Sequence, residues 1–254
     1  MVKLKELTDY LDNRLKIADI PGDHSNNGLQ VEGVSKVKKA IFGVDASLEI
    51  FERASAENAD FIFVHHGLSW GSQPKRFTGV DGKRLSTLFK SGISLYAAHL
   101  PLDAHAEIGH NALLANMLDL NSIKSFCEYD GAKIGMSGTL PVTKTSCEIA
   151  AVYEKKLDCK AQIFNDTGKK IGSVGIVSGG GGLDGLYSTA NGGYDCYITG
   201  EFNHTMWHHA KETGVSVIVL GHYKSETPGV LAVMKELSEK FSVETAFADI
   251  PTGL

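Results

Sequence analysis

Three short apolar segments of the chain each end at side chains that bind metal ions. FIFVHH ends at His65 and His66, ISLYAAHLPLD ends at His99 and Asp103, and VIVLGHYKSE ends at His222 and Glu226. Segments of this length and β-branched content are typical of buried strands. Ligands of open α/β sheets collect just beyond the carboxyl ends of the strands. We therefore predict a site for two metal ions at these three strand ends.

The donor types indicate which ions such a site would bind. Neutral imidazole and carboxylate groups are good ligands for zinc, iron, manganese, cobalt or nickel, and a mixed set favours these ions over calcium or magnesium. Neighbouring residues on a strand point to opposite faces. His65 and His66 can therefore share a site only where the strand ends, and Gly67 permits a turn there. The alternative is that one histidine caps the sheet through a hydrogen bond.

Asp103 is the stronger ligand candidate of the HLPLD segment. Pro101 removes a backbone donor and sets the direction of the chain just past the strand. His99 is expected either to bind metal or to hydrogen-bond the carboxylate of Asp103. The alternative for Asp103 is a turn or capping role for the following helix.

Glu226 is expected just outside a helix. Thr227 and Pro228 are typical of an N-cap and a first helical position. Both carboxylate oxygens of Glu226 would then be available to bridge two cations, and the backbone amides of the helix would face an approaching anion. A plain capping or surface role is the alternative.

Other polar segments are weaker candidates. Glu201 and His204 follow a fourth strand end and could line the pocket, whereas the helix carrying Trp207, His208 and His209 is more typical of a packed interface. His105 and His110 are expected to be solvent-facing or capping. The SGGGG segment at 178–182 favours a tight turn or mobile loop, with anion binding through its amides as the alternative. HSNNGLQVEG is a turn that could approach the site.

The order of segments predicts the fold class. Strand-like and helix-like runs alternate from VKKAIFGVDAS to HNALLANMLDL, which is typical of a mainly parallel sheet flanked by helices. Asp81 is expected before one helix, Gly92 to close it, and Gly109 to open the next. A second unit begins near residue 122, with a hairpin expected at residues 166–168. We predict two interleaved α/β lobes with mixed, mainly parallel sheets, residues 1–122 with 222–254 and residues 123–221, and a metal site between them.

Composition narrows the functional classes. The formal net charge is −5, which argues against binding nucleic acid by phosphate neutralisation unless residues such as Lys75, Arg76 and Lys83 form a local basic surface. The N-terminal segment lacks the features of a signal peptide, and no apolar run approaches the roughly 20 residues of a membrane span. The four cysteines lack CxxC spacing, which indicates reduced thiols in a cytoplasmic protein.

Five segments together resemble the GTP cyclohydrolase 1 type 2 homolog family, also called the Nif-three-like proteins, in its short form. They are NNGLQVEG, FVHHGLSW, AHLPLDAH, ITGEFNH and GHYKSETPGV, in that order over nearly the full length. The resemblance implies that His66 and Asp103 hold one divalent metal, that His65 and His222 hold the other, and that Glu226 bridges both. It also implies a ring-shaped homohexamer. Many relatives have a histidine where this chain has Tyr223, which puts a proton-transfer role there in doubt.

The resemblance favours a metal-dependent hydrolase acting on a nucleotide. A hydroxide held by the two metals would attack the C8 region of the guanine ring of GTP, with His99 as a proton shuttle. One alternative keeps the metals but hydrolyses phosphoesters. Another is a non-catalytic, ring-shaped metal-binding or regulatory protein.

Overall fold

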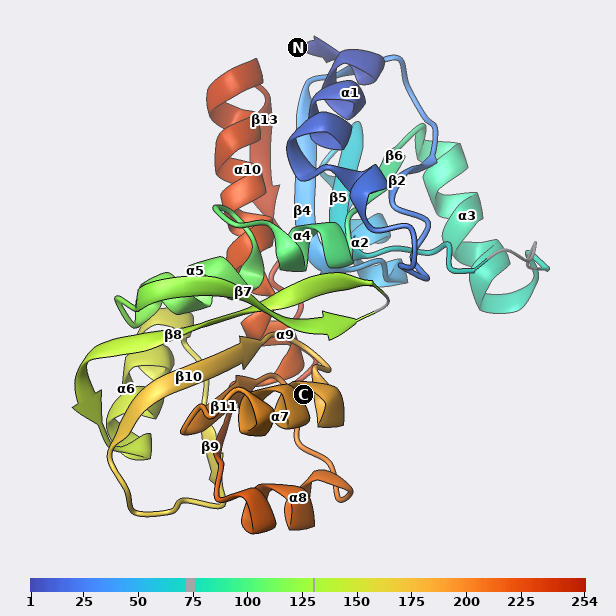
Figure 1. The fold of residues 1–254 in the computed structure, drawn as a ribbon. Helices are drawn as coiled ribbons and strands as arrows, with labels where there is room; N and C mark the ends of the chain where they lie inside the picture. The colour runs from blue at the N-terminus through green and yellow to red at the C-terminus, as the bar shows by residue number, and fades with distance from the viewer. Residues whose placement is uncertain (72–75, 130) are drawn as a thin grey trace. The chain divides into compact units, whose positions relative to one another are not determined.

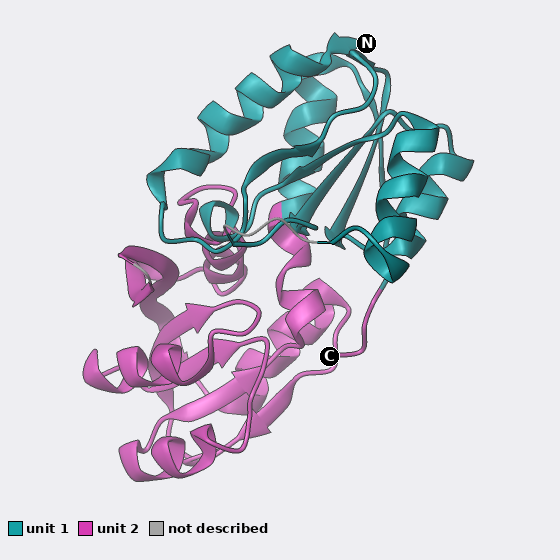
Figure 2. Ribbon diagram, turned by 90° about the vertical axis from the view of Figure 1, so that its right-hand side faces the viewer, with its two compact units in different colours: residues 1–102, 230–250 teal, residues 103–229, 251–254 magenta. Residues whose placement is uncertain are grey.

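The computed structural model describes residues 1–71, 76–129 and 131–254, so Lys75 lies outside the described residues. These residues form two compact units (Figure 2). Unit 1 comprises residues 1–102 and 230–250, and unit 2 comprises residues 103–229 and 251–254. Helices α4 (Leu100–Ala104) and α10 (Thr227–Phe241) each contain a boundary between the two.

Unit 1 is built on a five-stranded sheet of order β13-β4-β5-β6-β2, in which the four strands other than β2 run parallel. Its remaining elements are short strands and flanking helices (Figure 1). The elements of this unit, besides those that cross its boundary, are β1 (Val2–Lys3), α1 (Leu4–Leu15), η1 (Ile17–Asp19), β2 (Gly28–Val31), β3 (Lys36–Val37), β4 (Lys39–Asp45), α2 (Leu48–Ala56), β5 (Phe61–His66), α3 (Gly79–Ser91), β6 (Ser94–Ala97) and β13 (Glu244–Phe247).

Both faces of this sheet are buried, as a parallel sheet requires. Ile41, Ile62 and Leu95 belong to a core that also contains residues of α2. On the alternate positions the Phe63 ring contacts those of Phe42 and Tyr96, with centroids 5.6 and 5.8 Å apart. A strand that is buried on both faces has a continuous run of apolar residues in its sequence. These strands could therefore be predicted from the sequence.

Unit 2 is built on a mixed six-stranded sheet of order β7-β8-β10-β11-β12-β9, parallel only at its centre. Both units therefore have helices flanking mixed sheets, as predicted from the sequence. The elements of unit 2 are α5 (His110–Met117), β7 (Asn121–Tyr129), β8 (Ala132–Lys144), α6 (Ser146–Leu157), β9 (Gln162–Phe164), β10 (Ile171–Val177), α7 (Gly182–Asn191), β11 (Cys196–Thr199), α8 (Met206–Thr213), β12 (Ser216–Val219) and α9 (His222–Ser225).

The boundaries of the compact units differ from those drawn from the sequence at residues 122 and 222. Helix α5 belongs to unit 2 because Leu114 and Ala115 lie in the same core as Ile176 and Ile218 of its sheet. An amphipathic helix is assigned by what its apolar face packs against, and its place in the chain does not show that partner.

Two local predictions need correction. The hairpin expected at residues 166–168 is wrong, because β9 pairs with β12 while β10 pairs with β8 and β11. The side chain of Asn165 donates to the carbonyls of Ala210 and Val215, which fixes the chain beside β12 instead. Asp81 lies inside α3, which begins after Thr78, whereas Gly92 closes that helix with a φ of 65° as expected.

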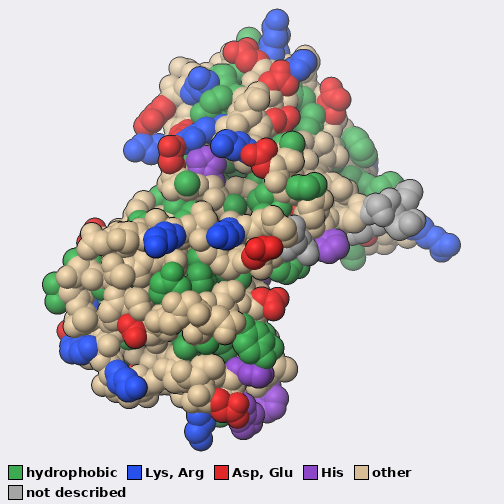
Figure 3. Space-filling view, in the orientation of Figure 1, with side chains coloured by type: hydrophobic (Ala, Val, Ile, Leu, Met, Phe, Trp, Pro, Cys, Tyr) green, Lys and Arg blue, Asp and Glu red, His purple; other side chains and the backbone are tan. Residues whose placement is uncertain are grey.

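Basic and acidic side chains are interspersed on the face seen in Figure 3, and neither kind forms a large patch there. Arg76 and Lys83 are exposed, and Lys83 lies 3.8 Å from Glu52. Among the described residues, no helix combines the length and apolar character that a membrane crossing needs.

Candidate metal centre

His65 and His66 are the last two residues of strand β5 in unit 1. The Nδ1 atom of His65 lies 2.9 Å from the carbonyl oxygen of Ala98, and that of His66 lies 2.8 Å from Oδ1 of Asp45. A carbonyl or carboxylate partner requires Nδ1 to carry the proton, which leaves the lone pair of each ring on Nε2. The two ring centroids are 4.5 Å apart. Both histidines thus keep the tautomer of a metal ligand.

His99 follows strand β6 of the same unit and is held in the same manner. Its Nδ1 atom lies 2.8 Å from Oδ1 of Asp23, and its backbone amide donates to Oδ1 of Asn27 at 2.7 Å. The pKa of Asp23 is lowered, because hydrogen bonds from His99 and Asn27 outweigh the opposing effect of burial. The segment containing Asn27 does approach the site.

The three histidines of unit 1 form a group that could hold a metal ion. Their candidate ligand atoms lie within 4.8 Å of one another. The ring of Trp70 packs edge-on to His99, with centroids 5.0 Å apart, and its indole N–H donates to the carbonyl of Gly67. A histidine whose Nδ1 donates to a carbonyl or carboxylate is the arrangement that orients metal-binding imidazoles.

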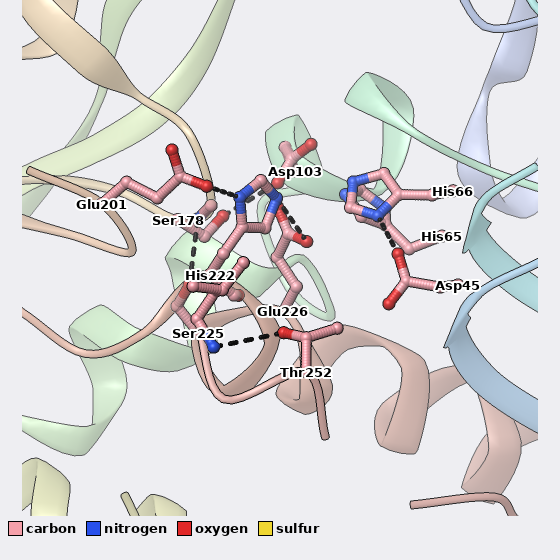
Figure 4. Close-up of polar contacts among 12 residues, drawn as sticks. Asp45, His65, His66, Asp103, Ser178, Glu201, His222, Ser225, Glu226 and Thr252 are labelled. Carbon is pink, nitrogen blue, oxygen red and sulfur yellow. Dashed lines mark hydrogen bonds and ion pairs between the residues drawn. The ribbon is translucent and has the colours of Figure 1, made fainter. Parts of the chain in front are cut away.

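In unit 2, His222 lies between two carboxylates (Figure 4). Its Nδ1 atom is 2.5 Å from Oε1 of Glu201, and its Nε2 atom is 3.2 Å from Oε2 of Glu226. Two atoms bonded to one zinc ion at about 2.0–2.1 Å in tetrahedral geometry lie about 3.3 Å apart. The spacing of Nε2 and Glu226 therefore suits a shared ion, with Glu201 in the orienting position.

The protonation of His222 responds to these neighbours. Burial lowers the pKa of His222, but hydrogen bonds and charge from Glu226 and then Glu201 outweigh it and raise the pKa to about 9. Without metal the imidazole is therefore protonated at neutral pH, and the proton occupies the position that a cation would take.

Asp103 is positioned by a buried hydrogen-bond network in unit 2. Ser178 donates from Oγ to Oδ1 of Asp103 at 2.9 Å, and its amide donates to Oδ1 of Asn111 at 2.7 Å. Asn111 in turn donates to the carbonyls of Asp103 and Ile134. The hydroxyl of Ser178 thus fixes one oxygen of the buried Asp103 carboxylate. The capping role considered for Asp103 is not its position here, since it lies inside α4.

The glycine-rich loop at 178–182 allows the backbone to approach Glu226. Gly179 has a φ of 58°, and a Cβ atom there would overlap the Glu226 carboxylate and lie 3.0 Å from Nε2 of His222. Its amide donates to Oγ of Ser225 at 2.9 Å. Glycine is required here by both the backbone conformation and the close contact. The loop is thus a tight turn, as the sequence favoured, beside the predicted ligands.

Glu226 lies between α9 and α10 and is only 3% exposed. Its position outside the long helix agrees with expectation, although Thr227 is the first residue of α10 rather than its cap. The surface role considered for Glu226 is excluded by this burial.

The remaining candidates lie in different environments. Glu201 contacts His222, whereas His204 and His208 are exposed, and His209 contacts the hydroxyl of Tyr187. His105 accepts the amides of Glu107 and Ile108 in its own turn, which is a capping role.

His110 is fully buried, so its predicted solvent-facing position is wrong. Its Nδ1 atom accepts the amide of Gly229 near the start of α10. The capping role is correct, but the capped helix is distant in sequence, and the sequence shows no such link.

Sequence reasoning missed the residues that orient the histidines, namely Asp23 and Asp45. Each is an acidic residue near a strand end or a turn, like many surface residues, and nothing in its local sequence marks it. Ser178 was noticed only as part of a glycine-rich loop.

Fold and donor groups together define an α/β protein with histidine and carboxylate groups suited to divalent metal ions. The sequence model of the family Duf34/NIF3 (NGG1p interacting factor 3) matches residues 2–252. The chain therefore belongs to the Duf34/NIF3 family, as the resemblance predicted.

Individual relatives agree over the full length. A protein of Archaeoglobus fulgidus, called GTP cyclohydrolase 1 type 2 homolog, is 43% identical over 253 residues, 100% of either chain. A solved structure from Thermus thermophilus is 39% identical, covers 100% of both chains and has a TM-score of 0.88. Reduced HcgD from Methanocaldococcus jannaschii is 28% identical, covers 98% of both chains and has a TM-score of 0.85.

Proposed function

We propose that this protein holds two divalent metal ions and acts as a metal-dependent hydrolase on a nucleotide. The predicted ligands are His65, His66, Asp103, His222 and Glu226. The observation that supports this best is the orientation of His65, His66 and His222, each with its Nδ1 atom held by a carbonyl or carboxylate so that Nε2 is the ring atom left to bind a metal ion. The names of the relatives support a guanine nucleotide as substrate.

The residues fit such ions chemically. Imidazole nitrogens and carboxylate oxygens are suited to zinc, iron, manganese, cobalt and nickel. When bound, paired ions lower the pKa of water toward neutrality and so supply a nucleophile. The buried Asp103 and Glu226 would balance the charge of the cations.

His99 is the candidate for proton transfer. Its Nδ1 atom is held by Asp23, whose side chain is only 1% exposed, so the imidazole can take a proton at Nε2 while the carboxylate stabilises the cation that results. This arrangement suits protonation of a leaving group or ring nitrogen.

The first experiment measures metal per chain on protein purified without an affinity tag. Wild type is expected to carry about two divalent ions, and Glu226→Gln clearly fewer, since a neutral amide is a poor bridging ligand. Glu212→Gln on the exposed side of α8 is the matched control and should retain the wild-type content. An absence of bound metal after reconstitution would refute the proposal.

The substrate is tested separately on metal-loaded protein. Release of formate from GTP is expected, beside an active control enzyme and a panel of phosphomonoesters and diesters. Hydrolysis of the phosphoesters alone would replace the cyclohydrolase assignment, and no turnover with full metal content would favour a binding or regulatory role.

We also propose the homohexamer that the family resemblance implies. Light scattering coupled to gel filtration tests it directly, and a monomer at micromolar concentration would contradict it.

A further inference from the structure

A cavity of about 670 Å³ lies in unit 2 beside Glu201. This volume is within the range of sites for small molecules and cofactors, about 300–1,000 Å³. Its walls come from the start of β9, the ends of β11 and β12, the first turn of α9 and the C-terminal segment. The lining side chains that carry the argument are Cys159, Lys160, Phe164, Glu201, Phe202 and Lys224.

Two lysines bring positive charge into this cavity. Lys224 is half-buried, and neither its ammonium group nor that of Lys160 has a hydrogen bond or ion pair with any described residue. The charge of Lys224 lowers the pKa of the Cys159 thiol, although burial has the larger, opposite effect and the pKa of this thiol is raised overall. A half-buried ammonium without a carboxylate partner favours an anionic ligand.

Acidic side chains also face the cavity, and they limit which anion would fit. Asp158 is exposed and lines the cavity. Oε1 of Glu201 contacts Nδ1 of the His222 imidazole. The second oxygen of Glu201 has no hydrogen bond within the described part of the chain and can accept one from an N–H group of a ligand.

Aromatic side chains also line the cavity. The rings of Phe164 and Phe202 stack with centroids 4.3 Å apart, both are partly exposed, and Tyr223 follows on α9. Flat aromatic ligands pack well against such side chains. Aromatic side chains, two lysines without an ion pair among the described residues and two carboxylates therefore line one cavity of ligand size.

We propose that this cavity binds an aromatic ring that carries a phosphate group, of the size of a nucleoside monophosphate. The lysines hold the phosphate, and Phe164 and Phe202 pack against the ring. The site lies on the Glu201 side of His222, whereas Nε2 of His222 faces Glu226 on the other side of the imidazole. The ligand thus contacts the residue that orients His222, and its binding does not require the metals.

Cys159 provides the test, because it lines the cavity and its alkylation is blocked by a bound ligand. Cys147 on α6 is exposed and serves as the internal reference. Metal-free protein in EDTA is treated with iodoacetamide at pH 8.5, and labelling of each cysteine is followed by peptide mass spectrometry. The probes are GMP, guanosine and inorganic phosphate.

GMP is expected to slow labelling of Cys159 and not of Cys147, at lower concentration than guanosine or phosphate. Lys224→Ala and Lys160→Ala should each raise the GMP concentration for half-protection about tenfold, since each loses one charged contact. Lys155 is an exposed lysine on α6, and Lys155→Ala should leave the GMP concentration for half-protection unchanged. Lys160 is also exposed, so Lys160→Ala should fold normally. It therefore still tests the proposal if Lys224→Ala does not fold.

The proposal would be overturned if millimolar GMP left Cys159 unprotected. It would also be overturned if GMP protected Cys159 in both lysine variants at the same concentration as in wild type. Equal protection by inorganic phosphate would overturn its aromatic part. Because the assay uses neither metal nor turnover, its result is independent of the proposed hydrolase.

Discussion

Replacing Gly179 by alanine should separate the geometry of the predicted ligands from the general stability of the fold. The added Cβ atom would overlap the Glu226 carboxylate and lie 3.0 Å from Nε2 of His222. Relief of this overlap requires Glu226 to move, because the amide of Gly179 is held by Ser225 and the loop cannot easily retreat. The donor pair at 3.2 Å would then be lost.

The expected magnitudes follow from two separate effects. A left-handed backbone costs a non-glycine residue roughly 1–2 kcal/mol, so the free energy of unfolding should fall by at least about that amount. Disturbing the groups that orient metal ligands typically weakens metal affinity about 10- to 100-fold, and displacing Glu226 should reach the upper end.

Gly182→Ala is the matched control. Gly182 has a φ of 53°, yet a Cβ atom there would meet nothing within 4 Å. Gly182→Ala should lose about 1–2 kcal/mol in urea unfolding of the metal-free protein, and Gly179→Ala should lose more, because it also disturbs the His222–Glu226 pair. Only Gly179→Ala should lose metal affinity in calorimetric titration with zinc or manganese. Wild-type affinity in Gly179→Ala, or an equal loss in Gly182→Ala, would refute the reasoning.

Further predictions concern protons, orientation and capping. Metal binding must displace the proton of His222, whose pKa is about 9 without metal. Affinity should therefore rise with pH by up to about tenfold per unit below pH 9, with proton release in calorimetry in several buffers; a flat profile would count against His222 as a ligand. Because the folded pKa of His222 is raised, its contribution to stability is full below about pH 6.5 and is lost as pH rises through 9. The stability difference between metal-free wild type and Glu201→Gln should follow that course in urea unfolding, and a difference that grows with pH would contradict it. Asp23→Asn should lower turnover about 10- to 100-fold while metal content stays near wild type, if His99 transfers protons; unchanged turnover would exclude that role. Thr145→Ala removes the capping box of α6 and should cost about 1 kcal/mol in urea unfolding with metal content unchanged, and a loss of metal would show that the effect is not local.

Much of this protein is determined by its sequence because the signals are local. Strands buried on both faces are continuous apolar runs, so FIFVHH and VIVLGH indicate both the strands and the positions of His65 and His222 at or beyond their ends. Helix ends follow the same logic, since Gly92 closes α3 with a left-handed backbone that glycine adopts without cost. The class of metal ion can also be predicted without knowing the fold, because histidine and carboxylate side chains by themselves favour certain divalent ions.

Only the tertiary structure decided which groups orient those donors. Asp23 reaches His99 across 76 residues of sequence, and Ser178 reaches Asp103 across 75. β9 joins the edge of a sheet next to β12 rather than its neighbour in the chain. Such pairings depend on side-chain packing between distant segments, and the free energy that selects them is gained only when the whole unit folds. Residue types near a strand end thus predict a metal centre, while the Nδ1 partners that hold each imidazole are a property of the folded units.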